Sequence, residues 1–169
     1  MKHTDKPQPS PESEQTLQNE AEKLQRSEYA RYLEPLQAAV QGKKVVSSRA
    51  GKSGFLLAFA DGSWVATYLV ADRLTYELGI GTPTAANLAQ LSSPSAGDAS
   101  APLTYNRPYA GGPCDIPIQV AHSHGHAIEG LACGAACFNF CFPSGMELDT
   151  SIVTDPEGRK ALRVFWEQW

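Results

Sequence analysis

Apolar residues in the first quarter of the chain recur at the spacing of one face of a helix, with Glu and Gln between them. The pattern predicts an amphipathic helix that begins at Glu12 and ends before Gly42. Pro35 should kink or split this helix near Glu34, because proline cannot donate the helical hydrogen bond. Such a helix usually covers a sheet, and docking to a protein partner is the alternative use. The apolar positions are Leu17, Leu24, Tyr32, Leu33, Leu36 and Val40.

Two runs of mainly apolar residues follow the helix and predict a β-hairpin. FLLAFA and SWVATYLV flank Asp61-Gly62, a favoured two-residue hairpin turn. If Ala60 pairs with Ser63, then Phe59 lies opposite Trp64 and an aromatic face of this hairpin belongs to the core. Val45 and Val46 should begin a strand before the hairpin, and residues 73–78 should extend the sheet after it.

The middle of the chain carries turn and loop signals. Thr82-Pro83 predicts a helix N-cap followed by proline at the first helical position, with the helix ending near Leu91. Residues 92–102 are rich in Ser, Ala, Gly and Pro, which predicts a mobile loop. Residues 105–114 should continue as irregular structure.

The C-terminal third is typical of an antiparallel meander. Residues 143–145 can close a short loop between FNFCF and MELDTSIV, which pairs Phe142 with Met146. The alternate face then carries Cys137, Cys141 and polar residues. We expect the last strand, ALRVFWEQW, to place Leu162, Val164 and Trp166 on that thiol-bearing face.

These elements predict an α+β fold, with N-terminal helices packed on a mainly antiparallel sheet that contains a hairpin and a C-terminal meander. Residues 1–11, with three prolines among polar residues, should form a flexible tail. Residues 12–169 should form a single domain, since 169 residues is an ordinary domain length.

Composition excludes some functions. A net charge of −4 and the absence of any Lys/Arg-rich run argue against nucleic-acid binding. No apolar run approaches the roughly 20 residues that span a bilayer, and the N-terminus lacks the apolar core of a signal peptide. We therefore expect no membrane association and a cytoplasmic protein with reduced thiols.

Residues 120–142, VAHSHGHAIEGLACGAACFNFCF, concentrate the residues that could carry chemistry. Imidazole and thiolate are ligands for zinc and other transition metals. The sequence therefore predicts a small metal-binding protein whose metal is zinc or another transition metal, with no reaction assigned. The candidate ligands are His122, His124, His126, Glu129, Cys133 and Cys137, with Cys141 as a further candidate.

One metal could bind both clusters only if the backbone reverses direction between them. A continuous helix would place His122 and Cys137 roughly 22 Å apart, whereas zinc ligands lie about 2.0 to 2.3 Å from the ion. We therefore expect a strand over 116–123, a short helical or irregular passage over 127–132, and a second strand over 136–142.

The spacing His122-x-His124-x4-Glu129 resembles the first metal-binding motif of the cupins, in which two histidines and a glutamate ligate a metal inside a β-barrel. The resemblance covers eight residues and implies that these three side chains are ligands. The chain departs from the family pattern because Ile116 stands where a glycine usually precedes the motif. No histidine follows His126 to supply the second cupin motif.

Two alternatives to metal binding stay open. The chain could be a non-catalytic interaction domain that binds a protein partner through its N-terminal helix or the edge of its C-terminal sheet, with histidines and cysteines in structural roles. It could also be a thiol-dependent enzyme, if a histidine lies within hydrogen-bond reach of a cysteine. The cysteines concerned would be Cys114, Cys133, Cys137 or Cys141.

Overall fold

The structure is a computed structural model, and it describes residues 11–70, 73–92, 107–108, 115–133, 137–154 and 157–168. Residues 1–10 of the predicted 1–11 tail and residues 93–102 of the predicted 92–102 loop lie outside these residues, and Pro11 is the first residue of a helix and not part of a tail. Most of the predicted irregular segment 105–114 does too. Only Arg107–Pro108 is described there, and it forms the short strand β5.

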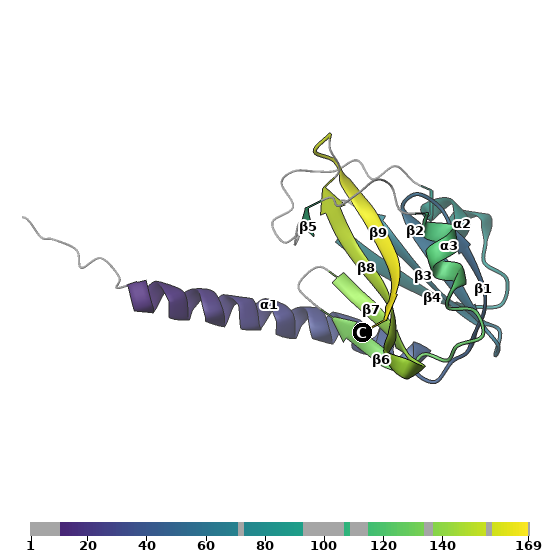
Figure 1. The fold of residues 1–169 in the computed structure, drawn as a ribbon, viewed down its shortest axis with the longest axis horizontal. Helices are drawn as coiled ribbons and strands as arrows, with labels where there is room; N and C mark the ends of the chain where they lie inside the picture. The colour runs from purple at the N-terminus through teal and green to yellow at the C-terminus, as the bar shows by residue number, and fades with distance from the viewer. Residues whose placement is uncertain are drawn as a thin grey trace, which may run out of the picture.

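The described residues form two sheets and three α-helices (Figure 1). The first sheet has the order β1-β2-β3-β4, with strands Val45–Ala50, Gly54–Phe59, Ser63–Val70 and Arg73–Ile80. The second contains β6 (Gly130–Cys133), β7 (Cys137–Phe142), β8 (Met146–Thr154) and β9 (Lys160–Gln168) in that order, and β5 pairs in parallel with the end of β8. The helices are α1 (Pro11–Val40), α2 (Ala85–Gln90) and α3 (Ile116–Ala121), and a 3-10 turn, η1, spans Pro143–Gly145. The predicted α+β class is therefore confirmed.

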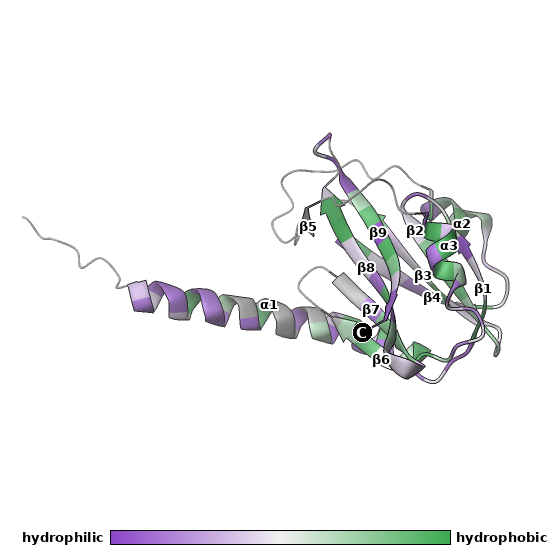
Figure 2. Cartoon of the chain, viewed as in Figure 1, coloured by the Kyte–Doolittle hydropathy of each residue, from purple (hydrophilic) through white to green (hydrophobic). Residues whose placement is uncertain are grey.

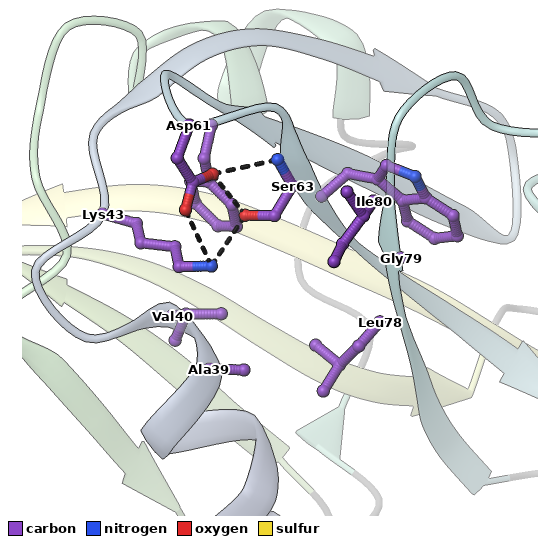
Figure 3. A pocket seen from close by; sticks show the side chains of 10 residues that line it. Ala39, Val40, Lys43, Asp61, Ser63, Leu78, Gly79 and Ile80 are labelled. Atoms are coloured by element: carbon purple, nitrogen blue, oxygen red, sulfur yellow. Dashed lines mark hydrogen bonds and ion pairs between the residues drawn. The ribbon is translucent and has the colours of Figure 1, made fainter.

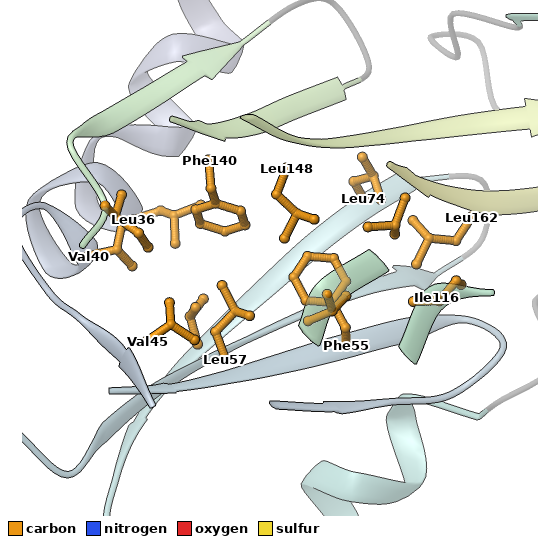
Figure 4. Packing of buried hydrophobic residues seen from close by; sticks show 14 of the residues in the cluster. Leu36, Val40, Val45, Phe55, Leu57, Leu74, Ile116, Phe140, Leu148 and Leu162 are labelled. Carbon is orange, nitrogen blue, oxygen red and sulfur yellow. The ribbon is translucent and has the colours of Figure 1, made fainter. Parts of the chain in front are cut away.

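The two sheets face each other across one hydrophobic core (Figure 4). Phe55 and Leu57 of the first sheet meet Phe140 and Leu148 of the second, and the rings of Phe55 and Phe140 pack edge to face. Helices contact the edge strands on both open sides of this sandwich. The end of α1 contacts β4 and β6, and α3 contacts β1 and β9. The helices therefore close the two gaps between the sheets.

Helix α1 runs without a break from Pro11 to Val40, so the predicted split near Glu34 is wrong. Pro35 is exposed, and the carbonyl that loses its hydrogen bond can therefore be solvated. The predicted stop is confirmed: Gly42 has φ +80° and its N–H donates to the Ile128 carbonyl at 2.7 Å. Only the last part of α1 packs on the body of the protein.

The hairpin of β2 and β3 forms, but its register differs by one residue from the prediction. Phe55 pairs with Thr67 and Ala58 pairs with Trp64, because the loop has three residues and Gly62 adopts a left-handed conformation at φ +85°. A shift of one residue moves side chains to the opposite face. Trp64 therefore packs with Leu91 beneath α2 and not in the core between the sheets.

The predicted strand over 116–123 is wrong, because this segment begins with α3. Ile116 and Val120 are buried one helical turn apart, whereas Ile118 between them is 56% exposed. Pro117 stands in the first turn, where a helix needs no backbone donor. The passage after α3 is irregular as far as Glu129, and β6 begins at Gly130.

The other predicted elements are largely confirmed. The N-cap of α2 is Thr84 and not Thr82, and Thr84 shares a reciprocal capping box with Asn87. Phe142 pairs with Met146 in the predicted register. The face assigned to the last strand is wrong, because Trp166 pairs with Leu148. Leu162, Val164 and Trp166 thus lie on the face opposite the Cys141 thiol.

Candidate functional site

The three histidines lie between α3 and the start of β6, on a turn held against β1. The Gly125 N–H donates to the Val45 carbonyl at 2.8 Å, and the Val45 N–H donates to the His126 carbonyl at 3.0 Å. Gly125 has φ +83°, a conformation that glycine adopts without steric cost. This turn separates His124 from His122 and His126, and all three side chains are exposed.

Two of the three imidazoles lie beside the same indole. The ring centroids of His122 and His126 lie 6.3 Å and 5.6 Å from that of Trp166. Phe142 completes the cluster, with its ring 5.0 Å from Trp166. The Gln119 side chain accepts a hydrogen bond from the Trp166 backbone N–H at 3.0 Å, which ties α3 to β9. The fold thus brings together side chains from the segment after α3, from β7 and from β9, which are far apart in the sequence.

The remaining imidazole and the described thiol lie apart from this cluster. His124 Nε2 is 2.7 Å from Ser48 Oγ on β1. Cys141 lies on the face of β7 opposite Phe142, since consecutive strand residues point to opposite faces. Its Sγ is 3.8 Å from a carboxylate oxygen of Glu147. The predicted convergence of histidines with a thiol is therefore not found at Cys141.

The surroundings of Cys141 disfavour its thiolate. Burial raises the pKa of this thiol, and the negative charges of Glu147 and Glu129 raise it further. The thiolate is the nucleophilic form, so a raised pKa makes Cys141 less reactive at neutral pH. An activated thiol at this position is not supported.

The other predicted ligands are placed only in part. Glu129 is exposed, and its backbone N–H donates to the Cys141 carbonyl at 2.8 Å. Cys133 and Cys137 lie on β6 and β7, but their side chains are outside the described part of the chain. Among the residues that the structure describes, no three His, Cys, Asp or Glu side chains come together to hold a metal ion. The ligand set implied by the cupin motif is likewise not assembled among them, because His122 and His124 have different neighbours.

A pocket of about 350 Å³, which the sequence did not predict, lies between the end of α1, the β2–β3 loop and the end of β4 (Figure 3). One wall is polar: Lys43 Nζ is 3.1 Å from Asp61 Oδ2 and donates to Ser63 Oγ at 2.7 Å. Hydrogen bonds from the Ser63 side chain and backbone, together with Lys43, lower the pKa of Asp61 to about 2. The apolar lining residues are Ala39, Val40, Phe59, Trp64, Leu78 and Ile80.

The polar wall does not form a catalytic pair. A serine activated by lysine needs a neutral amine as its base. Here Lys43 Nζ donates to Ser63 Oγ and lies 3.1 Å from Asp61 Oδ2, so it does not act as an acceptor for the hydroxyl. Ser63 Oγ also donates a hydrogen bond to Asp61 at 2.5 Å, so the hydroxyl is bound to the carboxylate and is not directed at a substrate. The Asp61-Gly62-Ser63 turn was the only sequence signal of this wall.

The exposed part of α1 is the largest unpacked element that the structure describes. Figure 1 shows this helix extending away from the two sheets. Leu33, Leu36 and Val40 are buried in the core, whereas Leu17 and Leu24 are 63% and 62% exposed. Every side chain described between residues 11 and 32 is exposed. Figure 2 shows that this part is mainly hydrophilic, with separate apolar positions.

The fold defines an α+β domain built as a two-sheet sandwich closed by helices. Comparisons with protein-family models, with curated protein sequences and with solved structures each found no match. The described residues include no helix that combines the length and the apolar character needed to cross a membrane. A proposal about function must therefore rest on the residues of this chain.

Proposed function

We propose that this protein is a non-catalytic interaction domain that binds a protein partner through the exposed part of α1. One observation carries the proposal: the same helix buries Leu33, Leu36 and Val40 in the core and leaves Leu17 and Leu24 in solvent. We name residues 11–31 the arm and residues 32–40 the anchor of α1, because the ring of Tyr32 already packs against Tyr76 of β4 at 5.1 Å. The anchor fixes the direction of the helix, and the arm exposes Leu17 and Leu24 to a partner.

The physics of isolated helices supports a partner for the arm. A helical segment of about 20 residues is only marginally stable in water without tertiary packing. The arm extends over roughly 30 Å at the helical rise of about 1.5 Å per residue. Covering an exposed leucine releases about 1.5 to 3 kcal/mol when burial is complete. Contact with a partner would therefore stabilise both the helix and the complex.

Site-specific photocrosslinking tests this proposal in cells that produce the full chain. A photoreactive amino acid in place of Leu24 should give a covalent adduct with the bound partner. The same amino acid in place of Lys23, which points to a different side of the helix, is the matched control and should give much less adduct. Absence of adduct at both positions, with the protein folded, would refute the proposal.

Metal binding stays a separate proposal, in which zinc or another transition metal is bound with ligands from residues 122–137. Its support is the concentration of imidazoles and thiols in the sequence and the pair His122 and His126 around Trp166. Elemental analysis of protein purified without chelator should find close to one equivalent of metal. Alanine at His122 and His126 should remove it. Metal-free, fully folded protein would refute this proposal.

The thiol-dependent enzyme is the least supported alternative. The raised pKa of Cys141 opposes it at the one cysteine whose side chain the structure describes. For Cys114, Cys133 and Cys137 it stays a prediction. Measuring the alkylation rate of each cysteine against pH would identify a thiol with a depressed pKa.

A further inference from the structure

We infer that the partner of α1 is a second copy of this chain, and that the two helices pack antiparallel. The inference rests on the proposed function, because it names the occupant of the same surface. It is carried by one row of exposed residues that continues from the arm onto the anchor. Alternating steps of four and three residues keep positions on one side of a helix, and this row carries apolar or small residues on both sides of a central pair of opposite charges. Its members are Leu17, Ala21, Leu24, Glu28, Arg31, Pro35 and Ala38.

The row faces solvent along its whole length, so packing of the two copies requires no change in the fold. The buried residues of the anchor occupy a different side of α1, because Leu33, Leu36 and Val40 lie roughly 100° or more around the helix from Leu17. The anchor can therefore stay in the core while the row meets a partner. Pro35 and Ala38 are exposed on this outer side.

The sizes of the residues in the row are complementary when the helices run antiparallel. If Glu28 of one copy faces Arg31 of the other, then Leu24 faces Pro35 and Ala21 faces Ala38. Leu17 then lies just past the end of the partner's α1, which stops at Val40. The larger Leu24 thus meets Pro35 and the two small alanines meet each other, as close packing requires.

The charges of the row select the antiparallel arrangement. Antiparallel packing forms two Glu28–Arg31 pairs related by twofold symmetry, and such isologous contact is the commonest kind in dimers. Parallel packing would instead set Glu28 against Glu28 and Arg31 against Arg31. Like charges at facing positions are destabilising, and a polar layer inside an apolar seam fixes its register.

The size of the contact predicts a weak dimer. With Glu28 facing Arg31, the two helices overlap from residue 19 to residue 40, about 32 Å, and a helix is about 10 Å wide. The facing surfaces therefore amount to roughly 600 Å² over both copies, below the usual size of a stable interface. The dimer should dissociate on dilution into the micromolar range, as small transient interfaces do.

Sedimentation equilibrium of the full chain, from micromolar to near-millimolar concentration, tests the inference. Wild-type protein should shift from monomer to dimer with rising concentration. Glu28→Arg or Arg31→Glu alone should weaken the dimer at least about tenfold, because each places like charges in the central layer. The double exchange, Glu28→Arg with Arg31→Glu, should restore it. Far-UV circular dichroism checks that each variant keeps its helices.

Lys23→Glu is the matched control, since it makes the same charge change as Arg31→Glu on a different side of the same helix. It should leave the dimer within about twofold of wild type. A monomer at every concentration, or a double exchange that fails to restore the dimer, would overturn the inference. Photocrosslinks from position 24 only to a different protein would overturn the homodimer and keep the proposed function. No crosslink at all would overturn both.

Discussion

The division of α1 into arm and anchor predicts a large difference between two leucine substitutions on one helix. Leu36 is 0% exposed in the core, whereas Leu24 is 62% exposed on the arm. Leu36→Ala removes side-chain atoms that are buried in the core and leaves a cavity. Leu24→Ala removes side-chain atoms that face water. Both make the same chemical change within α-helix, so helix propensity contributes equally to the two variants.

The expected magnitudes follow from burial. Leu-to-Ala substitutions in protein cores cost about 2 to 5 kcal/mol of unfolding free energy, and full burial places Leu36 within this range. At about 3 kcal/mol, a domain of this size should lose roughly 6 to 12 °C in its melting temperature. An exposed site away from special backbone geometry usually changes stability by less than about 0.5 kcal/mol, so Leu24→Ala should melt close to wild type.

Urea unfolding at low protein concentration, followed by circular dichroism, measures both variants. Low concentration matters because a dimer would add stability through Leu24 at high concentration. Equal destabilisation of the two variants would refute the separation of arm from anchor, because it would show that Leu24 packs inside the monomer. A cost below about 1 kcal/mol for Leu36→Ala would refute the placement of the anchor in the core.

Three further predictions concern individual contacts. Gly79→Ala should cost about 1 to 3 kcal/mol of unfolding free energy, because its Cβ would lie 2.0 Å from the neighbouring indole; Gly130→Ala, with nothing within 4 Å, is the control. The lowered pKa of Asp61, about 2 against 3.8, means that its contribution to stability is present above about pH 4 and is lost as the pH falls towards 2. Acid unfolding of Asp61→Asn should lack this part of the pH dependence, and an unchanged profile would contradict the assignment. Cys141 should react slowly with alkylating agents at neutral pH, and Glu147→Gln should increase the rate because it removes a negative charge that raises the thiol pKa. A slower or equal rate would show that this carboxylate does not control the thiol.

Most elements were predicted correctly where the turn residues and the spacing of apolar residues indicated the same element. The β7–β8 register was predicted because three residues, Pro143 to Gly145, connect two long apolar strands. The β2–β3 register was not, because the Asp61-Gly62 pair suits a two-residue turn but also fits the three-residue loop that forms. One residue of loop length decided which face Trp64 occupies.

The segment before the histidines shows why the spacing of apolar residues alone can predict the wrong secondary structure. Ile116, Ile118 and Val120 alternate as in a strand, yet Ile116 and Val120 also satisfy one helical turn. The helix forms because it closes the side of the sandwich between β1 and β9. Asp115 and Pro117 were the local signals that favoured a helix start.

The sequence by itself determined the α+β class, the long helix that stops at Gly42 and most strands of both sheets, because apolar spacing and turn residues act over a few neighbours. It did not predict β5 or β6, since residues 105–114 and 127–132 were expected to be irregular or helical. Only the tertiary structure decided where the chemistry lies. It placed His122 and His126 beside Trp166, directed His124 to Ser48, and set Cys141 on the other face of its strand. It also decided that one half of α1 enters the core and the other half stays in solvent. Contacts between distant segments depend on how the sheets face each other, and this arrangement cannot be read from spacing along one strand or helix.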